Sequence, residues 1–179
     1  MIDDALLESA CARLSARAAA LRSALFADPV RRSYTFQQIR EGISLGELRR
    51  DFEGGDSPRV IYIIAVDPES AQSVLEAFSA AALNKQRGYC LPRLVTKSPK
   101  PTMYVGSSQS IASRLHQHLN KAPGRTYALN MSRWCPSMEG IVHISIQCIS
   151  GGTGRDTFQD MEDALWLARE PMFGRLGSR

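Results

Sequence analysis

Residues 102–119, TMYVGSSQSIASRLHQHL, join a short apolar strand to an amphipathic helix. β-Branched and aromatic residues favour strands, so residues 102–105 are expected to form a strand that ends at Gly106. Ser110 is a residue type that caps helices, and a helix is expected from there to about residue 120. The segment therefore predicts one strand and one helix on either side of a glycine.

One cation in this helix lies at the edge of its apolar stripe. Ile111, Leu115 and Leu119 form the stripe, and Arg114 is next to it on the helical wheel. A cation held against the core can be rigid enough to bind phosphate, but a surface arginine whose stem covers apolar neighbours gives the same pattern. His118 lies one turn further along the same face, either as a member of the same site or as an ordinary structural histidine.

Two further segments predict strands. Residues 59–66, RVIYIIAV, are a β-branched and aromatic run typical of a buried strand, and residues 141–149, IVHISIQCI, alternate apolar and polar. Tyr62 and Tyr104 each lie inside a strand, where a tyrosine is usually a core aromatic with its hydroxyl hydrogen-bonded. Two strand residues on the same side of a sheet can nevertheless present both hydroxyls to one pocket.

The last predicted helix, residues 157–169, carries an acidic residue beside its apolar stripe. On a wheel of about 100° per residue, Glu162 falls within about 60° of Phe158 and Leu165. A carboxylate at the margin of a core needs a partner, which is either a metal ion or, in a structural salt bridge, an arginine. Glu162 is therefore a candidate metal ligand.

The N-terminal residues 3–26 predict a long helix in which leucines recur every seven residues. Leu7, Leu14 and Leu21 belong to an apolar seam. The seam either packs on the rest of the chain or pairs with a second copy, which would give a homodimer through the N-terminal helix.

The chain is expected to divide into an N-terminal helical segment, residues 1–55, and a domain formed by residues 56–179. Thr35 and Ser44 each begin a capping-box pattern that predicts a short helix in the first part. The stretch 53–58, EGGDSP, breaks the helical pattern and marks the boundary. The domain is predicted to be α+β, with a small central antiparallel sheet of three strands flanked by helices.

The segment 67–101 separates the first two predicted strands. Asp67 and the proline that follows it are expected to start a helix that runs to about residue 83. The rest of the segment is basic, and its stretch 89–95 can form a short strand interrupted at Pro92.

The composition is that of an ordinary folded protein of 179 residues, with 44% hydrophobic and 22% charged residues. A net charge of +4 suits an anionic partner such as nucleic acid, although simple solubility explains it equally well. The four cysteines form no CxxC pair and have no zinc-ligand spacing with the histidines, so free thiols in a reducing cytoplasm are expected. No apolar run is long enough for a membrane span, and no membrane partner is expected.

In their order along the chain, these motifs resemble the GIY-YIG nuclease superfamily over residues 58–179, with an insertion at 67–101. Val60-Ile61-Tyr62 stands at the family's first tripeptide, where Val60 replaces the usual glycine. Tyr104-Val105-Gly106 is a close form of the second tripeptide. The insertion makes the connection between the two tyrosines longer than the family's usual short hairpin.

The helix residues match the same family. Arg114 stands at the spacing from Tyr104 that the essential arginine has in the excision-repair members, and Glu162 matches the metal-binding glutamate. Pro171 and Phe173 match the terminal Pro-x-aromatic-Asn segment, with Gly174 in place of the asparagine.

This resemblance implies a metal-dependent endonuclease that hydrolyses phosphodiester bonds, most often in DNA. It implies that Glu162 holds one divalent cation, Mg²⁺ or Mn²⁺, and that Arg114 neutralises charge in the transition state. Tyr62 would be the general base, with a pKa lowered by a nearby cation. Tyr104 would position water or phosphate, and His118 would assist.

Basic residues outside this set are expected to bind the nucleic-acid backbone. They are Arg93, Lys97, Lys100, Arg125 and Arg133. Three other interpretations remain open: a catalytically inactive module of the same fold that binds nucleic acid or a protein partner, an unrelated α/β domain, and a structural protein that interacts through the N-terminal seam.

Overall fold

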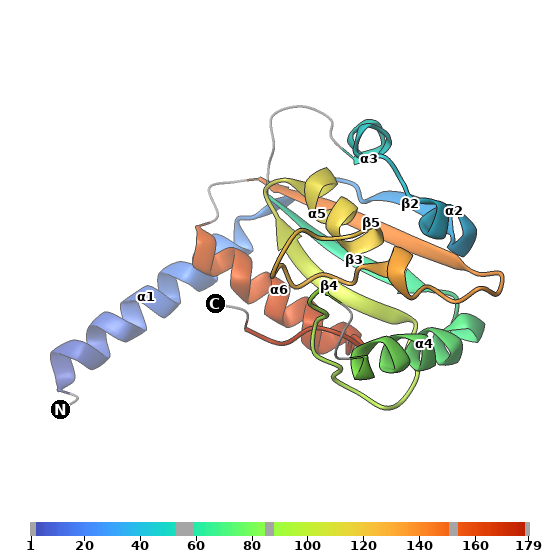
Figure 1. Ribbon diagram of the computed structural model, residues 1–179. Coiled ribbons are helices and arrows are strands. Elements are labelled where there is room, and N and C mark those ends of the chain that lie inside the picture. The colour runs from blue at the N-terminus through green and yellow to red at the C-terminus, as the bar shows by residue number, and fades with distance from the viewer. Residues whose placement is uncertain (1–2, 53–58, 85–87, 151–153, 178–179) are drawn as a thin grey trace.

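The computed structural model describes residues 3–52, 59–84, 88–150 and 154–177 (Figure 1). In chain order its elements are α1 (Asp4–Arg22), β1 (Leu25–Phe26), β2 (Val30–Thr35), α2 (Phe36–Glu41), α3 (Leu45–Phe52), β3 (Val60–Val66), η1 (Pro68–Ser70), α4 (Ala71–Leu83), β4 (Thr102–Ser108), α5 (Ile111–Leu119), η2 (Met131–Arg133), β5 (Ile141–Ser150) and α6 (Arg155–Arg169). The α+β class is confirmed. The predicted boundary at 53–58 lies outside the described residues, and so does the turn that the sequence predicts at Gly151 and Gly152.

The sheet has five antiparallel strands, so the prediction of three strands was wrong. Its order is β1-β5-β3-β4, and β2 also pairs with β5. The predicted strands became β3, β4 and β5. The additional strands β1 and β2 pair with β5 on the edge that β3 leaves free, which covers backbone groups that would otherwise be exposed. The N-terminal segment is therefore not purely helical.

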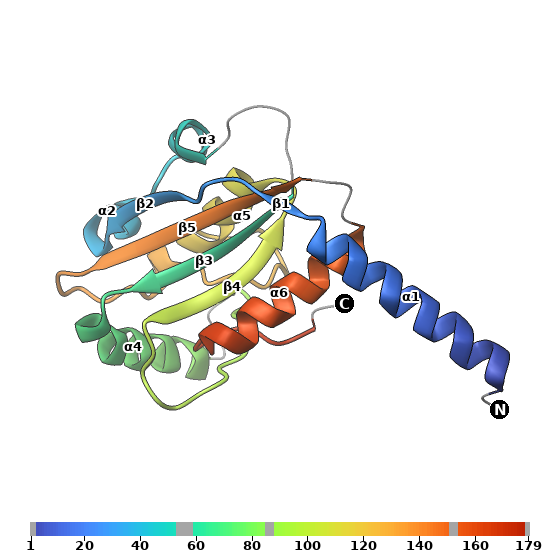
Figure 2. The same cartoon turned by 180° about the vertical axis from the view of Figure 1, so that it is seen from behind.

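Helices cover both faces of this sheet (Figures 1 and 2). The main core lies on the face that carries Tyr62 and Ile64, where α2, α4 and α5 contribute buried apolar residues. On the opposite face α6 packs beside β4, and Phe158 of α6 forms a small cluster with Ile61 and Ile149. The edge strand β4 is therefore flanked by α5 on one side and by α6 on the other.

The helix α1 projects away from the body and buries none of its residues (Figures 1 and 2). An ion pair between Arg17 and Asp160 joins its last turns to α6. It ends at Arg22 rather than near residue 26, because residues 25–26 pair with β5 as β1. No helix of the described residues is long and apolar enough to cross a membrane.

The segment 67–101 contributes described residues, in α4 and at Leu91, to the main core. Its helix begins as the short 3₁₀ turn η1 and continues as α4. Asp67 does not cap this helix with its side chain but accepts a hydrogen bond from His143 Nε2 at 2.8 Å, when that nitrogen carries the proton. The possible strand at 89–95 is reduced to two isolated bridges, Cys90 with Tyr127 and Leu94 with Phe173.

Candidate active site

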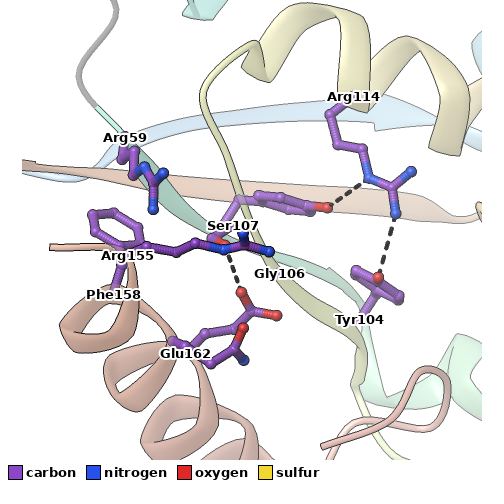
Figure 3. Close-up of a pocket in the computed structure, with 10 residues that line it drawn as sticks. Arg59, Tyr104, Gly106, Ser107, Arg114, Arg155, Phe158 and Glu162 are labelled. Carbon is purple, nitrogen blue, oxygen red and sulfur yellow. Dashed lines mark hydrogen bonds between the residues drawn. The ribbon is translucent and has the colours of Figure 1, made fainter. Parts of the chain in front are cut away.

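One polar pocket, with a volume of about 240 Å³, collects the four residues that carry the family resemblance (Figure 3). Tyr62 comes from β3, Tyr104 from β4, Arg114 from α5 and Glu162 from α6. The remaining lining residues are Arg59, Gly106, Ser107, Arg155, Phe158 and Gln159. Four separate elements thus bring the predicted side chains to one place.

The two tyrosine rings are packed together by the register of β3 and β4. Tyr62 pairs with Gly106, and the ring centroids of Tyr62 and Tyr104 are 6.1 Å apart with an angle of 17° between their planes. A Cβ atom at Gly106 would lie 2.7 Å from Tyr62 Oη. The ring can occupy this position only because residue 106 has no side chain.

The guanidinium of Arg114 is held by four hydrogen bonds, so this residue is not a loose surface arginine. Nε donates to Tyr62 Oη at 3.3 Å, and Nη2 donates to Tyr104 Oη at 3.4 Å. Nη2 also donates to the Tyr127 carbonyl at 3.0 Å, and Nη1 donates to Gln117 at 2.9 Å. The half-buried cation is therefore fixed against the oxygens of both tyrosines.

His118 is completely buried behind Tyr62 and does not line the pocket. The backbone N–H of Leu129 donates to its Nδ1 at 3.2 Å, so the ring proton is placed on Nε2. Nε2 then donates to Tyr62 Oη at 2.9 Å. Burial, together with the charge of Arg114, lowers the pKa of His118 well below its usual value, which keeps the imidazole neutral.

Tyr62 Oη therefore accepts hydrogen bonds from both His118 and Arg114. We expected a nearby cation to lower its pKa, and Arg114 acts in that direction. Burial outweighs this effect, and together with Tyr104 and Glu162 it raises the pKa of Tyr62 above the usual range. The tyrosine is only 1% exposed, so it is a neutral phenol in the protein alone.

Glu162 reaches the pocket from the other side of β4. Alternation along a strand places Ser107 on the face opposite to Gly106, and Ser107 Oγ donates to Glu162 Oε2 at 2.5 Å. Burial raises the pKa of Glu162, with a smaller contribution from Asp163, while the bond from Ser107 and the charge of Arg114 oppose the shift. Within the described chain Glu162 forms no salt bridge.

The donor set at Glu162 fits a hard divalent cation that keeps most of its water. Glu162 Oε1 accepts no hydrogen bond from the described residues, and Glu162 lines the same pocket as Ser107 and Tyr62. The described residues contain no group of three or more His, Cys, Asp or Glu side chains that could together hold a metal ion. Mg²⁺ needs only one or two protein carboxylates, so Glu162 can serve as its single charged ligand.

The residues predicted to grip nucleic acid do not all lie at this site. Arg93 lines an adjoining pocket that shares Tyr104, Arg114 and Glu162 with the first one. Lys100 pairs with Glu170 at 2.7 Å on the surface outside both pockets. The other three, Lys97, Arg125 and Arg133, are exposed and line neither pocket.

Sequence reasoning missed two cations and a hydroxyl that line the pocket, namely Arg59, Arg155 and Ser107. A signal for Arg155 was present in α6, because it precedes Glu162 by seven residues and lies on the same face of the helix. Arg59 stands alone before a strand, and no local pattern distinguishes it.

No protein-family model matches this chain, and neither a curated protein nor a solved structure matches it. What the chain does is therefore inferred from its residues and their geometry.

Proposed function

We propose that this chain is a GIY-YIG-type endonuclease that hydrolyses phosphodiester bonds in DNA with the help of a divalent cation. The observation that carries the proposal is the convergence of Tyr62, Tyr104, Arg114 and Glu162, from four elements, on one polar pocket. Each residue alone has an ordinary structural explanation. A fixed cation, two tyrosine hydroxyls and a carboxylate that forms no salt bridge with a described residue match the requirements of phosphoryl transfer.

In the proposed reaction, Arg114 binds the scissile phosphate and stabilises the charge that develops on its oxygens. Its bonds to the two tyrosines fix the direction of the guanidinium before substrate arrives. Mg²⁺ or Mn²⁺, when bound at Glu162, supplies further positive charge to the phosphate and the leaving oxygen.

Tyr62 Oη is the atom proposed to take the proton of the attacking water. The donors His118 Nε2 and Arg114 Nε both favour its phenolate form. Burial opposes this form by raising the pKa of Tyr62, and a divalent cation held by Glu162 would favour it by adding positive charge to the pocket. Tyr104 Oη positions the phosphate or the water beside it.

A second candidate function is a non-catalytic module that binds nucleic acid or a protein partner. The burial of Tyr62 favours this alternative, because a phenol with a raised pKa is a poor base near neutral pH.

A cleavage assay separates the two candidates. Purified protein is incubated with supercoiled plasmid, branched DNA, single-stranded DNA and RNA, in Mg²⁺ or in EDTA. Glu162→Ala and Arg114→Ala are compared with the exposed control Glu139→Ala. We expect metal-dependent nicking that both site variants lose and the control keeps. Binding without cleavage of any substrate, unchanged by Glu162→Ala, would establish the non-catalytic module instead.

A further inference from the structure

Two arginines in the pocket have no part in the proposed chemistry. Arg59 and Arg155 line the pocket together with Glu162 (Figure 3). They also line a second depression with Ser107, Ser108 and Gln109. That depression continues past Ser107 and does not include Glu162 or the tyrosines. The cleft therefore has a cationic end, formed by Arg59 and Arg155, that extends away from Glu162 and the tyrosines.

Arg59 is held in place before any ligand binds. Its guanidinium carbon lies 5.7 Å from the ring centroid of Phe158, which is a cation–π contact. With the Gln109 amide in the orientation that satisfies both groups, the amide oxygen accepts from Arg59 Nε at 3.0 Å and from Nη2 at 3.2 Å. These contacts leave Nη1 without an acceptor among the described residues, so the oriented cation can still donate to an anion.

Arg155 has no hydrogen bond or ion pair with any residue that the structure describes, although it lines both depressions. It belongs to the first turn of α6 and shares a helix face with Gln159 and Glu162, which both line the pocket. Arg114, by contrast, already donates four hydrogen bonds to protein oxygens. Arg155 is therefore the more available cation.

We propose that Arg59 and Arg155 bind the backbone phosphate next to the scissile one on the cleaved strand. This inference rests on the proposed function, and it assigns the path of the strand across the site. Guanidinium groups recognise phosphate through paired donors, and two of them can reach both non-bridging oxygens of a backbone phosphate. Contacts to phosphate carry no sequence information, so this subsite positions the strand without choosing the sequence.

Binding is measured in EDTA, which prevents cleavage, by the fluorescence anisotropy of a labelled DNA oligonucleotide. The double variant Arg59→Ala/Arg155→Ala is compared with wild type and with Arg169→Ala, an exposed arginine at the other end of α6. We expect the double variant to bind about tenfold more weakly. The slope of log K against log salt should become shallower by about 0.7–0.9, the value for one phosphate contact. Arg169→Ala should bind like wild type.

A neutral methylphosphonate, moved one linkage at a time along the oligonucleotide, then locates the contact. Neutralising the linkage next to the cleavage position should weaken DNA binding by wild type about as much as the double substitution does. The same neutral linkage should not weaken DNA binding by the double variant further. Additive losses, or equal affinities of the double variant and wild type, would overturn the subsite while leaving the nuclease proposal intact. If wild type binds no nucleic acid, both proposals fail.

Discussion

Replacing Gly106 with alanine tests whether the tyrosine pair is packed as tightly as the structure indicates. A Cβ atom there would lie 2.7 Å from Tyr62 Oη, 2.8 Å from Tyr62 Cζ and 2.9 Å from Tyr104 Cε1. Neither ring can move aside freely, because Arg114 and His118 hold Tyr62 Oη. Overpacking of this kind costs about 1–3 kcal/mol. For a chain of 179 residues this predicts a Tm lower by about 2–12 °C.

Gly46→Ala is a matched control, which is expected to raise the Tm rather than lower it. Gly46 lies inside α3, and a Cβ atom there would meet nothing within 4 Å. Alanine should stabilise this helix by up to about 1 kcal/mol. Both variants are compared with wild type by thermal unfolding. If Gly106→Ala has the same Tm as wild type, while Gly46→Ala behaves as expected, the packing described for Tyr62 is refuted.

The same substitution also bears on the proposed chemistry. Displacing Tyr62 from Arg114 by a few tenths of an ångström or more should reduce metal-dependent nicking, by about a hundredfold if the shift reaches 1 Å. The rate is measured at a temperature where both proteins are folded. Full activity in a destabilised Gly106→Ala variant would exclude Tyr62 as a precisely positioned base.

Three further predictions concern the carboxylate, the buried histidine and the N-terminal helix. Because burial raises the pKa of Glu162 in the folded protein, its charged form costs stability, and that cost grows as pH rises through the folded pKa. In EDTA, Glu162→Gln should therefore have a higher Tm than wild type at pH 8, and no higher Tm below pH about 4. A difference in Tm that does not change with pH would contradict the raised pKa of Glu162. His118→Phe removes one donor to Tyr62 and the acceptor for the Leu129 N–H, and urea unfolding should show a loss of about 1–3 kcal/mol, which an unchanged midpoint would contradict. Leu14 of the α1 seam is 62% exposed. If this seam forms a homodimer, sedimentation should show a dimeric wild type and a monomeric Leu14→Glu variant. A monomeric wild type would rule the dimer out.

The strands that the sequence failed to predict are those that depend on distant partners. In β2, with the sequence VRRSYT, only Tyr34 is buried, so the segment shows no alternation of apolar and polar residues. It is extended because Val30 to Thr35 pair with Ile146 to Ile141 of β5. Such pairing is a tertiary effect that no local window contains.

Elements whose burial follows a local period were predicted well. The alternating and β-branched runs gave β3 and β5, and the capping box of Thr35 and Gln38 is present at the start of α2. The helical wheel also placed Arg114 and Glu162 at the core margin, which is where both lie. These placements follow from the chain's own geometry and need no knowledge of its neighbours.

The cationic end of the cleft could not be predicted in the same way. Arg59 immediately precedes β3 and Arg155 begins α6, and only the packing of α6 beside the sheet brings them together. Isolated cations at the ends of elements are common on protein surfaces, so their residue type alone indicates nothing.

The segment 67–101 lengthens the connection between the tyrosines without separating them. Their distance is set by the antiparallel register of β3 and β4, in which Tyr62 pairs with Gly106 whatever the length of the chain between the strands. Residues of this segment also support the C-terminal segment of the site. Phe78 of α4 stacks on Phe173 with ring centroids 3.9 Å apart, and the Gly174 N–H donates to the Arg93 carbonyl at 2.9 Å.

Gly174 in turn adopts a φ of +117°, and a Cβ atom there would lie 3.4 Å from the ring of Tyr104. A left-handed conformation close to an aromatic ring is accessible to glycine at little cost, whereas an asparagine there would be strained. Gly174 is therefore well suited to this position beside Tyr104, where its N–H bonds to the Arg93 carbonyl. On this reasoning the segment 67–101 helps to fix the backbone of the C-terminal segment, and that backbone conformation favours glycine at position 174.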